Sequence, residues 1–79
     1  MSTPNTAPDG TTVRDIILWN RIGRISVELA RRLDITPLRA LQRFYQSHTC
    51  RRLHNEATGL YLYGDLYIVD EVIREWNSE

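Results

Sequence analysis

The sequence predicts an all-α protein, a small bundle of three to four helices with a short extended segment near residues 59–63. Two observations carry this prediction. Apolar residues recur at the three- and four-residue spacing of an amphipathic helix through 13–33 and again through 65–76. A Thr-Pro pair at 36–37 marks the start of a further helix between them. The length of 79 residues fits one domain.

The chain divides into a tail and a domain. Residues 1–11 contain two Pro and one Gly, and no large apolar residue after Met1. This composition is typical of disordered segments. We therefore expect a disordered N-terminal tail over 1–11 and a single small helical domain over 12–79. A domain of this size buries only about 60% of its unfolded surface, so a partner or a second copy would help to stabilise it.

The first predicted helix begins after Thr12, which can cap it together with Asp15, a weaker form of the capping box. One face of this helix gathers the residues that we expect to be buried: Leu18, Trp19, Ile22, Ile25, Ser26, Leu29, Ala30 and Leu33. The other face is rich in Arg but contains Ile16, Ile17 and Val27. Three apolar residues there indicate a second contact, and a homodimer built on them is one interpretation.

Two shorter helices follow. The Thr-Pro pair at 36–37 supplies an N-cap and a favourable first residue, so a helix is predicted as far as about residue 46. Its expected buried residues are Leu38, Leu41 and Phe44, with Tyr45 a further candidate. Ser47 can cap a short third helix, which Cys50 and Leu53 would anchor.

The segment before the last helix combines a turn and an alternating run. The sequence NEATG over 55–59 is a turn signal whose final glycine is free to adopt positive φ. The next four residues alternate between Leu and Tyr. If they are extended, Leu60 and Leu62 face inward while Tyr61 and Tyr63 face outward.

The last predicted helix runs from about residue 65 to 76. Asp65 is expected to cap it and to favour the positive end of the helix dipole. Asp70 and Arg74, four residues apart, are expected to pair weakly. The face expected to be buried contains Leu66, Val69, Val72, Ile73 and Trp76.

Charge is unevenly distributed although the formal net charge is zero. Residues 14–52 hold nine Arg against three acidic residues, a formal charge of +6. Residues 53–79 hold one Arg against six acidic residues, a formal charge of −5. The basic half can bind phosphate or an acidic partner, or the two halves can neutralise each other within the domain.

The composition also bears on location. No apolar run approaches the roughly 20 residues that span a bilayer, and the N-terminus lacks the basic and apolar regions of a signal peptide. The single cysteine, Cys50, cannot form an internal disulfide, which fits a reducing compartment. We expect a cytoplasmic protein with no membrane partner.

Catalytic and metal sites have few candidate residues. His48, Cys50 and His54 are the soft-metal candidates, but a structural zinc site needs four ligands. Cys50 and His54 also suggest a thiol nucleophile, which would further need an orienting group and a cleft. The chain has no Gly-rich phosphate loop. We therefore expect no catalytic residue, no metal and no cofactor, and a protein that is not an enzyme.

The stretch from 27 to 44 has the outline of a helix-turn-helix, with a small residue at Ala30 and a short turn. Two features oppose this interpretation: Asp34 stands where Gly is common, and Arg43 stands where the second helix usually has a buried apolar residue. A nucleic-acid-binding protein remains the alternative hypothesis. Its contacts would be Arg39, Gln42 and Arg43, assisted by Arg51 and Arg52.

Most of the chain resembles a family of short, uncharacterised bacterial proteins, the domain-of-unknown-function 3791 family. The likeness is carried by ITPLRALQRFYQSHTCRRL, TGLY and YIVDEVIREW, within Ile35 to Trp76. The resemblance implies no catalytic residue. It implies a small accessory or antitoxin-like protein, because such chains are often encoded beside an ADP-ribosyltransferase-like protein in an arrangement similar to toxin–antitoxin pairs.

The leading functional hypothesis is a small non-catalytic protein-interaction module, with that ADP-ribosyltransferase-like protein as one candidate partner. Tyr and Arg are the residues most enriched at binding hot spots. The candidate partner-binding residues are Tyr61, Tyr63, Tyr67, Arg51, Arg52, Asp70 and Arg74.

Overall fold

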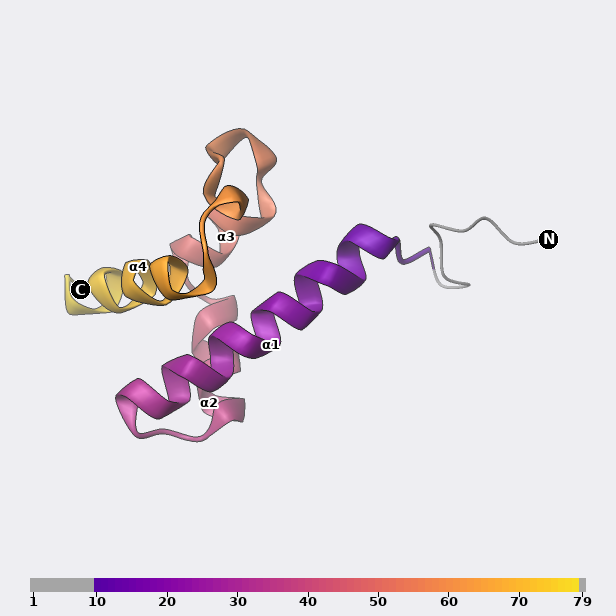
Figure 1. The fold of residues 1–79 in the computed structure, drawn as a ribbon. Helices are drawn as coiled ribbons and strands as arrows, with labels where there is room; N and C mark the ends of the chain where they lie inside the picture. Colours follow the sequence, from indigo (N-terminus) through magenta and orange to yellow (C-terminus); the bar gives the residue numbers. More distant parts are fainter. Residues whose placement is uncertain (1–9, 79) are drawn as a thin grey trace.

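The computed structural model describes residues 10–78, which form four α-helices, two single-turn 3-10 helices and no strand (Figure 1). In chain order the elements are α1 (Val13–Leu33), α2 (Pro37–Tyr45), α3 (His48–His54), η1 (Glu56–Thr58), η2 (Leu60–Leu62) and α4 (Asp65–Asn77). The predicted all-α bundle is confirmed. The tail predicted over 1–11 falls largely on residues 1–9, which lie outside the described residues.

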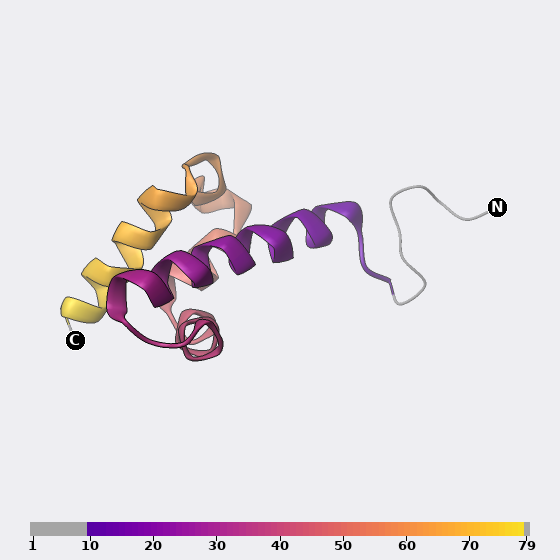
Figure 2. The same ribbon diagram turned by 60° about the horizontal axis from the view of Figure 1, so that its bottom comes forward.

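The long helix α1 organises the molecule. In Figure 1 it crosses in front of α2, and in Figure 2 α2 and α4 lie on different sides of its C-terminal half. Both α2 and α4 pack against α1, and α3 packs against α2 and α4. The N-terminal half of α1 extends beyond the region where α2 crosses it (Figure 2). One face of α1 therefore has neighbours along the C-terminal half, and its outward face has none.

Local hydrogen bonds set the helix starts as the sequence predicts. The Thr12 hydroxyl accepts from the Asp15 N–H at 3.1 Å, and the Asp15 carboxylate accepts from the Thr12 N–H at 3.2 Å, a complete capping box. The Thr36 and Ser47 hydroxyls cap α2 and α3 by accepting from the N–H of Arg39 and of Cys50, without a reciprocal side-chain bond. Caps of this kind each stabilise a helix by about 1 kcal/mol. Asp34 ends α1 in the left-handed conformation, which Asp tolerates better than most residues.

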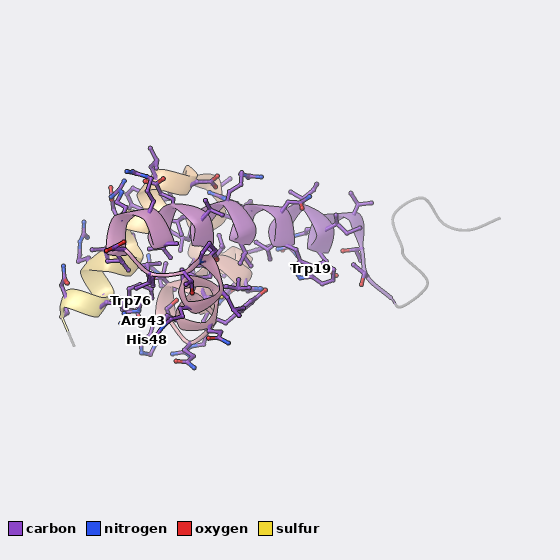
Figure 3. The ribbon with its side chains drawn as sticks, turned by 90° about the horizontal axis from the view of Figure 1, so that it is seen from below. Trp19, Arg43, His48 and Trp76 are labelled. Atoms are coloured by element: carbon purple, nitrogen blue, oxygen red, sulfur yellow. The ribbon has the colours of Figure 1, made fainter. Side chains whose placement is uncertain are left out.

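The core lies where the four helices meet. Its fully buried large side chains are Ile22, Ile25, Leu29, Phe44, Leu53, Leu60, Ile68, Val69 and Val72. Most predicted core residues of α1 are confirmed, but Trp19 is 51% exposed because it lies toward the extended N-terminal end of α1 (Figure 3). The predictions for Leu38, Tyr45 and Leu66 are wrong. All three are exposed because α2 turns Ala40 and Phe44 inward, and α4 turns Ile68 inward.

The segment predicted to be extended near 59–63 is a 3-10 turn, so that prediction is wrong. Gly59 does adopt positive φ, at 72°, as predicted. A 3-10 helix has three residues per turn, so residues two apart do not share a face as they do in a strand. This geometry buries Leu60 and leaves Leu62 74% exposed.

Candidate functional site

Five large exposed side chains gather within seven consecutive residues of η2 and the start of α4. They are Tyr61, Leu62, Tyr63, Leu66 and Tyr67, and we call them the tyrosine platform. Solvent-exposed apolar residues are ordinary when scattered, but a cluster of this kind marks an interaction surface. Three of the five are the tyrosines predicted from the sequence as partner-binding candidates.

The three tyrosine rings of the platform lie in two separate places. Tyr63 and Tyr67 stack on each other, with ring centroids 4.4 Å apart and planes 18° from parallel. The two residues are one helical turn apart across the start of α4. Tyr61 instead lies at a groove of about 190 Å³ between α1 and the 60–63 segment. The groove is lined by Arg14, Ile17, Leu18, Arg21, Leu53 and Tyr61, and thus offers an apolar floor with two guanidinium groups.

One arginine of α1 fixes the backbone beneath the platform. Arg21 donates from Nη1 to the Tyr61 carbonyl at 2.7 Å and from Nη2 to the Tyr63 carbonyl. Its Nε donates to Asp65 Oδ1 at 2.8 Å. A planar guanidinium with five donors suits such a three-point contact better than a lysine ammonium would. These three contacts hold the segment from Tyr61 to Asp65 in place against α1.

Asp65 completes this clamp. Its second carboxylate oxygen accepts from Arg24 Nε at 2.9 Å. Partial burial raises the pKa of Asp65, but the hydrogen bonds from Arg24 and Arg21 outweigh burial and hold the pKa below its usual value. The prediction that Asp65 caps α4 is wrong. Gly64 is the N-cap and no side-chain oxygen caps this end, because the Asp65 carboxylate is turned toward α1.

The other predicted partner-binding residues engage different side chains. Asp70 accepts from Arg32 at 2.8 Å, so its predicted pairing with Arg74 is wrong. Arg74 lies 2.9 Å from Glu71. Arg52 lies 3.4 Å from the same carboxylate. The Asp70 and Arg52 contacts tie α4 to α1 and α3, the Arg74 pair is local to α4, and the structure does not bring these residues into the platform.

The remaining candidate, Arg51, belongs to α3. Its guanidinium contacts the ring of His48, one turn earlier on the same helix. Both side chains are exposed. Arg51 is therefore accessible, but its polar contact is local and leads away from η2.

The nucleic-acid candidates lie on α2. Arg43 stacks its guanidinium over the Trp76 ring at 4.1 Å from the centroid, and Figure 3 shows the two together with His48. Gln42 and Arg39 are exposed. Among residues 10–78, Arg39 is the one arginine whose side chain has no ion pair, hydrogen bond or ring contact.

The ion pairs largely join the basic and acidic halves of the chain. Arg14 pairs with Glu56, Arg21 and Arg24 with Asp65, Arg32 with Asp70, and Arg52 with Glu71. The charge asymmetry is thus compensated inside the domain, in agreement with the neutralisation interpretation. Exposed pairs of this kind each contribute only about 0–1 kcal/mol. Their larger consequence is that little of the basic charge is left without a carboxylate.

The cysteine and histidines offer little reactivity. Burial raises the pKa of the Cys50 thiol to about 11, although the charge of Arg51 lowers it, so the thiol is protonated at neutral pH. His54 Nδ1 lies 2.9 Å from the Cys50 carbonyl and 3.6 Å from its sulfur. Within residues 10–78, His, Cys, Asp and Glu form no cluster of three that could hold a metal ion.

Sequence reasoning missed three residues of this site. Arg21 appears as one of several polar-face arginines, and its contacts lie 40 to 44 residues away in the chain. The alternation of Leu and Tyr over 60–63 predicts that Leu62 faces the interior. The helical spacing of the last helix predicts the same for Leu66. The sequence does contain a signal for them. Residues 60–67 include more large side chains than one face of the core can bury.

Comparison with protein-family models, curated proteins and solved structures returns no match for this chain. No helix within the described residues has both the length and the apolar character needed to cross a membrane.

Proposed function

We propose that this protein is a small non-catalytic module that binds another protein through the tyrosine platform. The observation that carries the proposal is the clamped, exposed cluster of Tyr61, Leu62, Tyr63, Leu66 and Tyr67. Tyr supplies a large amphipathic contact with few rotatable bonds, so little side-chain entropy is lost on binding. Such a surface suits a partner more than a substrate.

The side chains of the platform indicate which kind of partner surface would be complementary to it. Stacked Tyr63 and Tyr67 and the nearby leucines favour an apolar or aromatic patch, while the tyrosine hydroxyls favour hydrogen-bond acceptors around it. The groove beside Tyr61 accommodates one apolar side chain, and the Arg14 guanidinium in its lining is already paired with Glu56 at 3.1 Å. The expected partner surface is therefore apolar at its centre, with hydrogen-bond acceptors around it.

The family resemblance supplies a first candidate partner. Chains of that kind are often encoded beside an ADP-ribosyltransferase-like protein, and we propose that this chain acts as its antitoxin-like accessory in the bacterial cytoplasm. The platform supports binding of a protein surface but does not by itself select this one. The neighbouring gene product is therefore the first protein to test.

Site-specific photo-crosslinking tests the platform. A photo-crosslinking amino acid introduced at Leu62, in the native host, is expected to capture a defined partner, because that side chain is 74% exposed at the platform. The matched control carries the same group at Leu38 on α2, which is 63% exposed. A defined adduct from Leu62 and none from Leu38 supports the proposal. The same adducts from both positions, or none from Leu62, would refute it.

A second function, nucleic-acid binding through α2, is favoured by one observation. Arg39 lacks an acidic partner, and Gln42 and Arg43 are exposed beside it. Arginines of this kind are capable of phosphate and base contacts. Binding of this type weakens steeply with salt, because phosphate contacts release counterions.

Fluorescence anisotropy with a labelled duplex decides this alternative. If α2 binds nucleic acid, affinity should fall sharply between 50 and 200 mM salt. It should also fall on Arg39→Ala, and much less on Arg31→Ala, whose side chain is held by Glu28. No binding of duplex at low salt would rule out this function.

A further inference from the structure

The outward face of α1 carries a regularly spaced stripe of exposed residues, three of them large and apolar, that is separate from the tyrosine platform. Figure 1 shows this helix in front of the others, and its free face points away from them. The exposed residues along it are Val13, Ile16, Asn20, Gly23 and Val27, which we call the outer stripe. Val27 is 60% exposed, although it is a large apolar residue in the middle of a helix.

The spacing along the outer stripe is that of a coiled coil. Its residues follow one another at intervals of three, four, three and four, so Val13, Asn20 and Val27 occupy one core position of a heptad and Ile16 and Gly23 the other. Ile25, on the opposite side of the helix, is fully buried in the bundle's own core. Thus α1 has one face for its own bundle and a second face with the spacing of a helix seam.

We propose that a second copy of this chain docks on the outer stripe, α1 against α1 in parallel and in register, to form a homodimer. Asn20, in the middle of the stripe, favours a second copy of this chain over an unrelated apolar surface. Its amide would lose its hydrogen bonds against an unrelated apolar surface. Against the Asn20 of a second parallel copy, each amide finds a donor and an acceptor, the arrangement known to fix register and orientation in parallel coiled coils.

Steric and electrostatic features of α1 permit this approach. A Cβ built on Gly23 meets nothing within 4 Å, so two backbones can come close there. Beside the stripe, Arg24 is paired with Asp65 at 2.9 Å and Arg31 with Glu28 at 2.5 Å. Two identical faces therefore meet without uncompensated positive charge.

The edges of the stripe are complementary as well. In a parallel heptad dimer, the position of Trp19 falls opposite the position of Arg24 in the second copy. The indole is half exposed and thus available for a guanidinium, a favourable cation–π pair. In an antiparallel pair the positions of Trp19 and Arg24 are not related by this edge contact.

Light scattering on the full chain over a range of concentrations tests the dimer. The wild-type protein should show a dimeric mass, and Ile16→Glu and Val27→Glu should each give a monomer with unchanged helical circular dichroism. Leu38→Glu is the matched control, since Leu38 is similarly exposed but lies on α2. It should remain a dimer.

Cross-linking tests the orientation. Val27→Cys should form a disulfide-linked dimer under mild oxidation, because parallel pairing brings the two positions together, and the buried Cys50 does not compete. A constant monomeric mass for the wild type, or a dimer that survives both Glu substitutions, would overturn the proposal. A dimer that both substitutions abolish, yet in which Val27→Cys does not cross-link, would overturn the parallel arrangement. Neither result depends on the partner of the tyrosine platform.

Discussion

At the scale of single residues, Arg21 decides the shape of the binding surface. It alone joins α1 to the two carbonyls under the platform, it shares Asp65 with Arg24, and its side chain is only 14% exposed. Hydrogen bonds that involve a charged group contribute about 1.5–3 kcal/mol each when partly buried. The same contacts order the platform, so the proposed binding surface and the stability of the fold share one side chain.

We predict that Arg21→Ala lowers the free energy of unfolding by about 2 kcal/mol, because Asp65 and two carbonyls lose their donor. Urea unfolding followed by circular dichroism measures this change. The control is Arg31→Ala, whose exposed local pair with Glu28 should contribute less than about 0.5 kcal/mol. Equal effects of the two substitutions would contradict the clamp.

Cys50 provides a second test at this scale. Because burial raises the pKa of its thiol to about 11, we predict slow alkylation by iodoacetamide at pH 8 in the folded protein and fast alkylation in urea. Mass spectrometry follows the reaction over time. Rapid modification of the folded protein would show that the thiol is accessible and reactive.

At the scale of elements, the short helix α3 depends on a carboxylate from α4. Glu75 accepts from the His48 N–H at 2.8 Å, and from the Thr49 N–H at 2.9 Å and hydroxyl at 2.8 Å. Burial raises the pKa of Glu75, but these hydrogen bonds outweigh it, so the pKa lies below its usual value. The folded state therefore favours the ionised form.

We predict that Glu75→Gln destabilises the protein by about 1 kcal/mol at pH 7. Because the pKa of Glu75 is lowered by folding, the stabilisation is fully present above the usual carboxyl range and is lost as pH falls through the lowered pKa. The difference between wild type and Glu75→Gln should therefore shrink in acid. Denaturant midpoints at pH 7, 4 and 3 measure it, and a difference independent of pH would contradict the capping role.

The elements also show which features a sequence reveals. The caps at Thr12, Thr36 and Ser47 were predictable because donor and acceptor lie three residues apart. The contacts of Arg21 and Glu75 were not, since their partners lie more than 25 residues away. Four alternating residues do not distinguish a strand from a 3-10 turn, and this ambiguity misplaced Leu62. The tyrosines of the candidate site were predictable as residue types, but not their arrangement.

At the scale of the whole molecule, ionised carboxylates stabilise the fold: Asp65 joins α4 to α1, Glu75 joins α4 to α3, and Glu28 pairs within α1. Hydrogen bonds from Arg31 and Arg32 lower the pKa of Glu28 to about 2, and the pKa values of Asp65 and Glu75 are lowered as well. We predict that thermal stability falls progressively from about pH 4.5 toward pH 2. Differential scanning calorimetry across this range checks it. An unchanged melting temperature down to pH 2 would contradict the contribution of these pairs.

The central claim is that this compact bundle presents the tyrosine platform to another protein. Calorimetric titration with the cross-linked partner, once purified, tests it most directly. Tyr67→Ala should weaken binding at least about 30-fold, the effect of losing a hot spot of 2 kcal/mol, while Leu38→Ala changes it less than about twofold. Unchanged affinity for Tyr67→Ala, or a greater loss for Leu38→Ala, would contradict the claim.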